Sequence, residues 1–201
     1  MAIEIERKFR PQTSPAEWGW RVLNATAWEI RQAYITPPDA TPEVRIRESR
    51  MVTLESAFEP IRDPVKGDVV LRRLAVKADI QTTTEGGVSR HEIEPELSEH
   101  EFLALWDATE GRRLRKVRIE YLADLPSGEP RVVTIDIFQD HLFGLMMGEI
   151  EFGDWKSSVE FEPPSFLGYE VTHDKRYRNA ALAVATEPPP VDDAREPAQE
   201  R

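Results

Sequence analysis

Charged and apolar residues alternate along several segments of the chain. In the first of these, Glu4, Glu6 and Lys8 fall on one side of an extended backbone. Ile3 and Ile5 fall on the other side, and this period of two predicts a β-strand with one ionisable face. The same alternation returns later, so eight strands are expected, at residues 1–10, 30–36, 43–49, 69–80, 89–96, 114–122, 131–138 and 145–152.

Two or three helices are expected beside the strands. Ser98 and Glu101 form a capping-box pattern at the start of an apolar stripe, which predicts a helix over 98–109. A Ser-Pro pair suits the start of a short helix in 14–24. Residues 178–186 fit a terminal helix.

The remaining segments show neither period. Residues 50–67 are predicted to be an inserted loop, and 161–177 an irregular segment that covers one end of the structure. Residues 187–201 are acidic and rich in proline, which predicts a disordered tail. A chain of 201 residues with 40% hydrophobic content can bury one core, so residues 1–186 are expected to form one domain.

The composition excludes several classes of protein. There are no cysteines, which rules out disulfides and thiolate chemistry. The formal net charge of -11 argues against a general attraction to nucleic acid or to anionic membranes. No apolar stretch is long enough to cross a bilayer, so a cytoplasmic location is expected. The sequence leaves open whether the chain forms a homodimer.

The repetition of the ionisable face decides the expected fold. For any one strand, a face exposed to water is the simpler interpretation. Six or seven such strands with short connections instead favour an antiparallel sheet that closes around a polar lumen. The expected fold class is therefore α+β, an eight-stranded antiparallel β-barrel with a few flanking helices.

The lumen of such a barrel would hold acids and bases in equal number. Ion pairing alone is a costly way to fill an interior, because buried pairs often fail to repay their desolvation. Arginine and lysine clusters instead suit phosphate oxygens, and grouped carboxylates hold divalent cations. The pattern thus indicates a metal-bound polyphosphate as the ligand. The lumen acids would be Glu4, Glu6, Glu92, Glu94, Asp136, Glu149 and Glu151, and the bases Lys8, Arg45, Arg47, Lys77, Arg90, Lys116 and Arg118.

Short motifs spread in order over almost the whole chain also point to a known family. They are EIERKF at 4–9, VRIR at 44–47, AVKAD at 75–79, SRHEIE at 89–94, KVR at 116–118, IDIF at 135–138, GEIEF at 148–152 and GYEVTHDKRYRNAALA at 168–183. With these motifs the chain resembles the CYTH superfamily of triphosphate tunnel metalloenzymes. The resemblance implies an eight-stranded antiparallel tunnel that binds triphosphate with Mg²⁺ or Mn²⁺. The inserted loop and the acidic tail depart from the family's pattern without removing a motif.

By this resemblance, the expected activity is divalent-metal-dependent hydrolysis of a triphosphate, with inorganic tripolyphosphate as the leading substrate. The products would be diphosphate and phosphate. The alternatives are an enzyme for an organic triphosphate, such as a thiamine triphosphatase or an adenylate cyclase, and a non-catalytic polyphosphate or nucleotide sensor. The sequence does not separate them, since the tunnel would bind the triphosphate and unplaced loops would recognise any organic group.

The lumen residues are expected to divide by role. The metal ligands would be Glu4, Glu6, Glu149 and Glu151, and the phosphate-binding residues Lys8, Arg45, Arg47, Lys77, Arg90, Lys116 and Arg118. The catalytic set would be Glu4, Glu6, Lys8, Glu92, Glu94 and Asp136, the last three as further ligands or water-positioning groups. Glu149 and Glu151 are expected close to Glu4 or Glu6. Without metal, their mutual repulsion would raise the pKa of at least one of these carboxylates.

Overall fold

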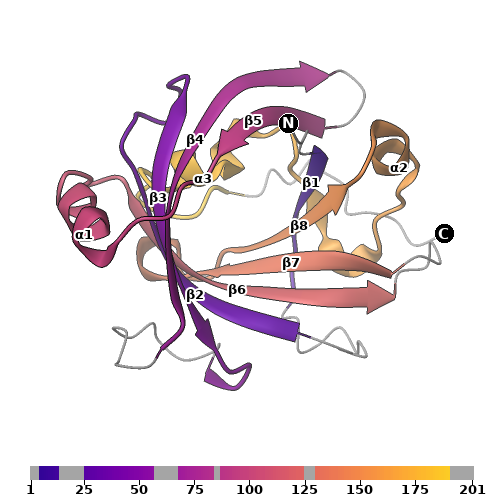
Figure 1. Ribbon diagram of the computed structural model, residues 1–201. Helices are drawn as coiled ribbons and strands as arrows, with labels where there is room; N and C mark the ends of the chain where they lie inside the picture. Colours follow the sequence, from indigo (N-terminus) through magenta and orange to yellow (C-terminus); the bar gives the residue numbers. More distant parts are fainter. Residues whose placement is uncertain (1–4, 14–24, 57–67, 84–86, 125–129, 191–201) are drawn as a thin grey trace.

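The computed structural model of the chain describes residues 5–13, 25–56, 68–83, 87–124 and 130–190. Within these ranges one sheet of nine strands dominates the structure (Figure 1). The strands are β1 (Ile5–Arg10), β2 (Ala25–Tyr34), β3 (Glu43–Val52), β4 (Val70–Thr83), β5 (Gly87–Ile93), β6 (Arg113–Asp124), β7 (Pro130–Phe138), β8 (Met146–Phe152) and β9 (Tyr169–Glu170).

Neighbouring strands of the sheet are antiparallel throughout. Their order is β5-β4-β3-β2-β6-β7-β8-β1-β9. The sheet curls, so that Cα atoms of β1 and β5 come within 8 Å of each other. Within the described residues no hydrogen-bonded ladder joins β5 to β1. The predicted α+β antiparallel fold is confirmed, although the sheet is an open row curled into a tunnel rather than a fully bonded barrel.

The strands differ from the prediction mainly in their extent. β2 begins at Ala25, earlier than predicted, and its added half carries a buried ion pair between Glu29 and Arg50 of β3. A buried glutamate breaks the simple alternation from which the strand was predicted. β3 continues into the predicted inserted loop, of which residues 57–67 lie outside the described part of the chain. β9 was not predicted, because two residues are too few to show a period.

The helix predicted from the capping box is confirmed as α1 (Glu99–Asp107). The backbone N–H of Glu101 donates to Ser98 Oγ at 3.3 Å, and the Ser98 N–H donates to the Glu101 carboxylate at 2.8 Å. α3 (Asn179–Leu182) is shorter than the predicted terminal helix, and the helix predicted in 14–24 lies outside the described residues. In the described ranges, no helix is long and apolar enough to cross a membrane. The other helical elements are α2 (Trp155–Glu160) and the 3-10 helices η3 (Asp140–Leu142), η4 (Ser165–Leu167) and η5 (Lys175–Tyr177).

The two faces of the curled sheet differ in chemistry. On the outer face, Ile119, Ile135 and Ile150 of three adjacent strands are buried in an apolar core. Successive side chains of a strand point to opposite faces, so Arg118 and Glu149, next to these isoleucines, face the inside of the curl. The apolar core on the outer face therefore fixes the register that holds the charged residues inside.

The described chain ends in a segment that contacts the end of β1. Arg10 donates a hydrogen bond from Nη1 to the carbonyl oxygen of Pro189 at 2.7 Å. The hydroxyl of Tyr177 donates to the carbonyl oxygen of Pro190 at 3.3 Å. The remainder of the predicted tail, residues 191–201, lies outside the described residues.

Candidate active site

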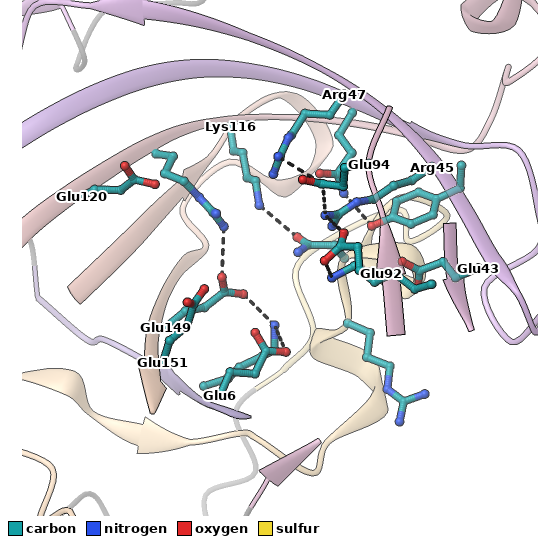
Figure 2. A pocket seen from close by; sticks show the side chains of 17 residues that line it. Glu6, Glu43, Arg45, Arg47, Glu92, Glu94, Lys116, Glu120, Glu149 and Glu151 are labelled. Carbon is teal, nitrogen blue, oxygen red and sulfur yellow. Dashed lines mark hydrogen bonds and ion pairs between the residues drawn. The ribbon is translucent and has the colours of Figure 1, made fainter. Parts of the chain in front are cut away.

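A central pocket of about 260 Å³ lies inside the curled sheet and is lined almost wholly by polar atoms (Figure 2). Most of the lumen residues predicted from the sequence meet here: Glu6, Lys8, Arg45, Arg47, Lys77, Glu92, Glu94, Lys116, Arg118, Glu149 and Glu151. Asp136 is buried and bonded to two of them. Glu4 and the side chain of Arg90 lie outside the described residues. The strands thus bring distant sequence segments into one charged cavity.

At one end of the pocket, strand pairing places Lys8 between carboxylates. Glu6 lies opposite Glu151 in the β1–β8 ladder, and Lys8 lies opposite Glu149. The Lys8 Nζ is 2.6 Å from Glu149 Oε1 and 3.3 Å from Glu6 Oε1. Burial alone would lower the pKa of Lys8, but the charges of Glu149 and Glu6 raise it above its usual value. Lys8 is therefore held as an ammonium ion among the predicted metal ligands.

Glu149 contacts two cations, Lys8 and Arg118, in the pocket. Its second carboxylate oxygen accepts a hydrogen bond from Arg118 Nη2 at 3.0 Å. Burial disfavours the charged carboxylate, but Lys8, Arg118 and Lys116 hold its pKa well below the usual value. The rise predicted for at least one of the clustered carboxylates is therefore not found at Glu149, because cationic side chains contact both of its oxygens.

Asp136 of β7 is buried beneath Lys116 and Arg118, two cations that line the pocket and form its floor. It is 1% exposed and accepts hydrogen bonds from Lys116 Nζ at 2.6 Å and from Arg118 Nε and Nη2 at 2.8 Å. Burial opposes its ionisation, but these two cations lower its pKa. Burial also lowers the pKa of Lys116, to about 8, against the opposing effect of Asp136. With both oxygens occupied, Asp136 orients Lys116 and Arg118 toward the pocket.

On the other side of the pocket, the arginines of β3 make longer contacts with two carboxylates, Glu92 of β5 and Glu94 just after β5. Arg45 Nη2 is 3.1 Å from Glu92 and 3.4 Å from Glu94. Arg47 Nη2 is 3.4 Å from Glu94, while Lys77 Nζ is 3.0 Å from Glu92. Burial and the neighbouring Arg45 lower the pKa of Arg47 to about 10. The positive charge at Arg47 is therefore less well neutralised than that at Lys8.

The sequence did not single out several neutral and charged residues of the pocket. Gln32 and Tyr34 lie two positions apart on β2 and so share its inner face, and the Gln32 amide donates to the Tyr34 hydroxyl at 2.5 Å. Their spacing of two was a usable signal, but their side chains carry no charge. Asn179, at the start of α3, accepts a hydrogen bond from Lys116 Nζ at 3.3 Å, and no strand period places this segment at the pocket. The others are Glu43, Glu120 and Arg178.

The donors of the pocket suit a divalent ion by their chemistry. Glu6, Glu149 and Glu151 project from neighbouring strands, and carboxylate oxygens are the ligands that Mg²⁺ and Mn²⁺ prefer. Among the described residues, however, no three carboxylate or imidazole side chains are already gathered as an ion would need. The ammonium group of Lys8 lies between two of these carboxylates. Ion binding would thus require Lys8 to move.

The chain is similar to proteins of known structure and name, although no protein-family model matches it. It is 36% identical over 185 residues to the inorganic triphosphatase of Nitrosomonas europaea, and the aligned region covers 90% of this chain and 97% of that protein. A crystal structure of an inorganic triphosphatase matches with a TM-score of 0.58 and 32% identity, over 92% of this chain and 97% of the other. A second crystal structure, described as that of a hypothetical protein, matches with a TM-score of 0.57, 32% identity and coverages of 90% and 98%. This chain therefore belongs to the family of the Nitrosomonas europaea inorganic triphosphatase.

Proposed function

We propose that this protein is a metal-dependent triphosphatase of the CYTH superfamily that hydrolyses inorganic tripolyphosphate to diphosphate and phosphate. The family relationship supports this activity, since the Nitrosomonas europaea relative is named an inorganic triphosphatase. The observation that carries the proposal is the convergence of cationic and carboxylate side chains on one polar pocket. The cations that converge there include Lys8, Arg45, Arg47, Lys116 and Arg118.

Substrate binding would replace internal ion pairs with contacts to phosphate oxygens. Arg45 and Arg47 lie 3.1 to 3.4 Å from their carboxylate partners, so these contacts are easier to exchange than the 2.6 Å pair of Lys116 and Asp136. An arginine side chain can donate two parallel hydrogen bonds to one phosphate group. The β3 arginines would therefore bind a phosphate group, while Lys116 and Arg118 bind from the floor.

The metal would be held by Glu6, Glu149 and Glu151, together with the predicted ligand Glu4, which lies outside the described residues. A bound Mg²⁺ or Mn²⁺ would neutralise substrate charge and polarise the reacting phosphoryl group. Lys8 would leave Glu6 and Glu149 and bind a phosphate oxygen. The carboxylates of the pocket would thus exchange an ammonium group for the metal ion, and Lys8 would exchange carboxylates for phosphate.

Hydrolysis would proceed without a covalent intermediate. A water oxygen bonds to a terminal phosphorus while the bridging P–O bond breaks; the leaving diphosphate takes the electron pair and accepts the proton that the water releases. Lys116 and Arg118 would stabilise the charge that develops on the phosphate oxygens. Once Arg45 and Arg47 turn to substrate, Glu92 or Glu94, each still beside one further cation, would accept a hydrogen bond from the attacking water and orient it.

A second cavity gives a reason to consider organic triphosphates as well. This cavity of about 230 Å³ shares Arg47, Arg118 and Glu120 with the central pocket. Trp28 and Ile30 of β2 also line it, so an apolar group attached to a triphosphate would meet an indole ring there. ATP and thiamine triphosphate therefore belong in the substrate test.

Phosphate release should be measured with tripolyphosphate, ATP and thiamine triphosphate, each with Mg²⁺, with Mn²⁺ and with a chelator. We expect release to be fastest from tripolyphosphate and to stop when the chelator removes the divalent ion. Faster release from an organic triphosphate would support the second candidate. Binding of tripolyphosphate without turnover with either metal would indicate a sensor and contradict the proposal.

A further inference from the structure

A short segment after η4 runs tightly along the edge of β1 that does not pair with β8. Val171 donates its backbone N–H to the carbonyl oxygen of Lys8 at 2.8 Å. Gly168 has a φ of +70°, and a Cβ atom there would lie 2.2 Å from the carbonyl oxygen of Arg10. Only glycine therefore permits this approach. The segment that contains Val171 and Thr172 is fixed against the strand that carries Lys8 into the pocket.

The hydroxyl of Thr172 completes the backbone hydrogen bonds of Lys8 on this edge. Thr172 Oγ1 accepts the Lys8 N–H at 2.9 Å. The regular ladder of β9 ends at Glu170, so the strand partner that an N–H would normally have is replaced here by a side chain. Val171 and Thr172 thus bind both backbone polar groups of Lys8.

Glu170 sets the direction of that hydroxyl. Thr172 Oγ1 donates to Glu170 Oε1 at 2.7 Å, a shorter contact than the 3.4 Å to the Lys8 carbonyl oxygen. A hydroxyl has a single hydrogen, so donation to Glu170 leaves its lone pairs toward the Lys8 N–H. Glu170 is anchored in turn by Arg7, which donates to both carboxylate oxygens at 2.9 and 2.6 Å.

Arg7 is fixed on the face of β1 opposite the pocket. Its Nη1 donates to the carbonyl oxygens of Ser158 and Phe161 at 2.9 and 2.7 Å. Its guanidinium group lies 5.4 Å from the ring centre of Phe9 and 5.6 Å from that of Phe161. A continuous chain of contacts therefore leads from α2 through Arg7 and Glu170 to the hydroxyl that binds Lys8.

We propose that Thr172, oriented by Glu170, is a positioning residue that fixes the Lys8 backbone and so directs the Lys8 ammonium group into the pocket. The inference rests on the proposed function, in which Lys8 binds a phosphate oxygen. Thr172 itself does not contact the substrate. Its loss displaces a cation that must lie within hydrogen-bond distance of the substrate, and small misplacements in an active site reduce turnover strongly.

The test compares Thr172→Val, which removes the hydroxyl at nearly constant shape, with Thr172→Ser, which keeps it. We expect Thr172→Val to lower kcat/KM for tripolyphosphate about 10- to 100-fold, and Thr172→Ser to stay close to the wild type. Thr53→Val is the matched control, because Thr53 Oγ1 also accepts a backbone N–H, that of Ser56, at an exposed turn. This control should keep the wild-type kcat/KM.

A second readout does not depend on turnover: the hydrogen exchange rate of the Lys8 amide, measured by NMR. Thr172→Val should raise this rate, and Thr172→Ser should not. Equal kcat/KM in Thr172→Val and the wild type, an equal loss in both Thr172 variants, or an unchanged Lys8 exchange rate in Thr172→Val would overturn the inference. A wild-type protein that does not hydrolyse tripolyphosphate would instead overturn the proposed function, while the Lys8 exchange rates still decide the positioning role.

Discussion

Replacing Glu149 with Gln should remove most hydrolysis and also destabilise the protein without metal. The carboxylate accepts hydrogen bonds from Lys8 at 2.6 Å and from Arg118 at 3.0 Å. A neutral amide weakens both contacts, and hydrogen bonds to charged groups contribute about 1.5–3 kcal/mol. The amide is also a poorer ligand for a hard ion, whose charge stabilisation amounts to several kcal/mol. We therefore expect kcat to fall by about 100-fold or more.

The destabilisation by Glu149→Gln should depend on pH. The pKa of Glu149 in the folded protein lies well below its usual value, so its charge stabilises the fold at pH values above the unfolded pKa. This stabilisation is lost as the pH falls through the folded pKa. The free energy of unfolding of the wild type should therefore exceed that of the variant at pH 7, and the difference should shrink in acid.

Urea unfolding at a series of pH values, with a chelator present, measures this difference. Glu120→Gln is the matched control, since Glu120 lines the same pocket and its hydrogen bond from Thr26 is 3.3 Å long at an exposed position. The control should unfold with nearly the wild-type free energy. An unfolding free energy of Glu149→Gln equal to that of the wild type at pH 7 would show that the ion pairs of Glu149 do not stabilise the metal-free protein.

Replacing Arg47 with Ala should separate binding from stability. Burial and Arg45 lower the pKa of Arg47 to about 10, so the folded protein disfavours this charge relative to the unfolded chain. Its removal should leave the free energy of unfolding unchanged or slightly higher. Tripolyphosphate, however, would lose a charge-assisted contact of about 1.5–3 kcal/mol, which corresponds to roughly 10- to 100-fold weaker binding.

Calorimetry with tripolyphosphate and thermal unfolding would measure the two effects of Arg47→Ala. Arg73→Ala is a suitable control, because Arg73 also contacts Glu94, at 3.5 Å, but lines the second cavity and not the central pocket. It should reduce the affinity less than Arg47→Ala does. Equal affinities of Arg47→Ala and the wild type would remove Arg47 from the phosphate-binding set.

The sequence predicts much of the fold because the outer core and the charged interior obey one period. Arg118 and Ile119 show the rule, since one points into the pocket and the next is buried in the core. The rule fails for β9, which exists because Gly168 allows the chain to approach β1. It also misses Gln32 and Tyr34, which share the spacing of the charged residues but not their charge.

Period alone cannot show how the charges pair. Lys8 and Glu149 are 141 positions apart, and their contact depends on the register between β1 and β8. The same holds for Asp136, which is buried beneath Lys116 and Arg118 and holds these two side chains instead of lining the pocket itself. Most charged residues of the pocket could be identified from the sequence, whereas their pKa values depend on cross-strand contacts between segments far apart in the chain.

The central claim is that this charged pocket hydrolyses a triphosphate with the help of a divalent ion, and ³¹P NMR of tripolyphosphate tests it most directly. With Mg²⁺ or Mn²⁺, the wild-type protein should convert the tripolyphosphate signals into those of diphosphate and phosphate in equal amounts. Glu149→Gln should slow this conversion strongly, and a chelator should stop it. Unchanged tripolyphosphate signals with the folded wild-type protein and either metal would contradict the claim.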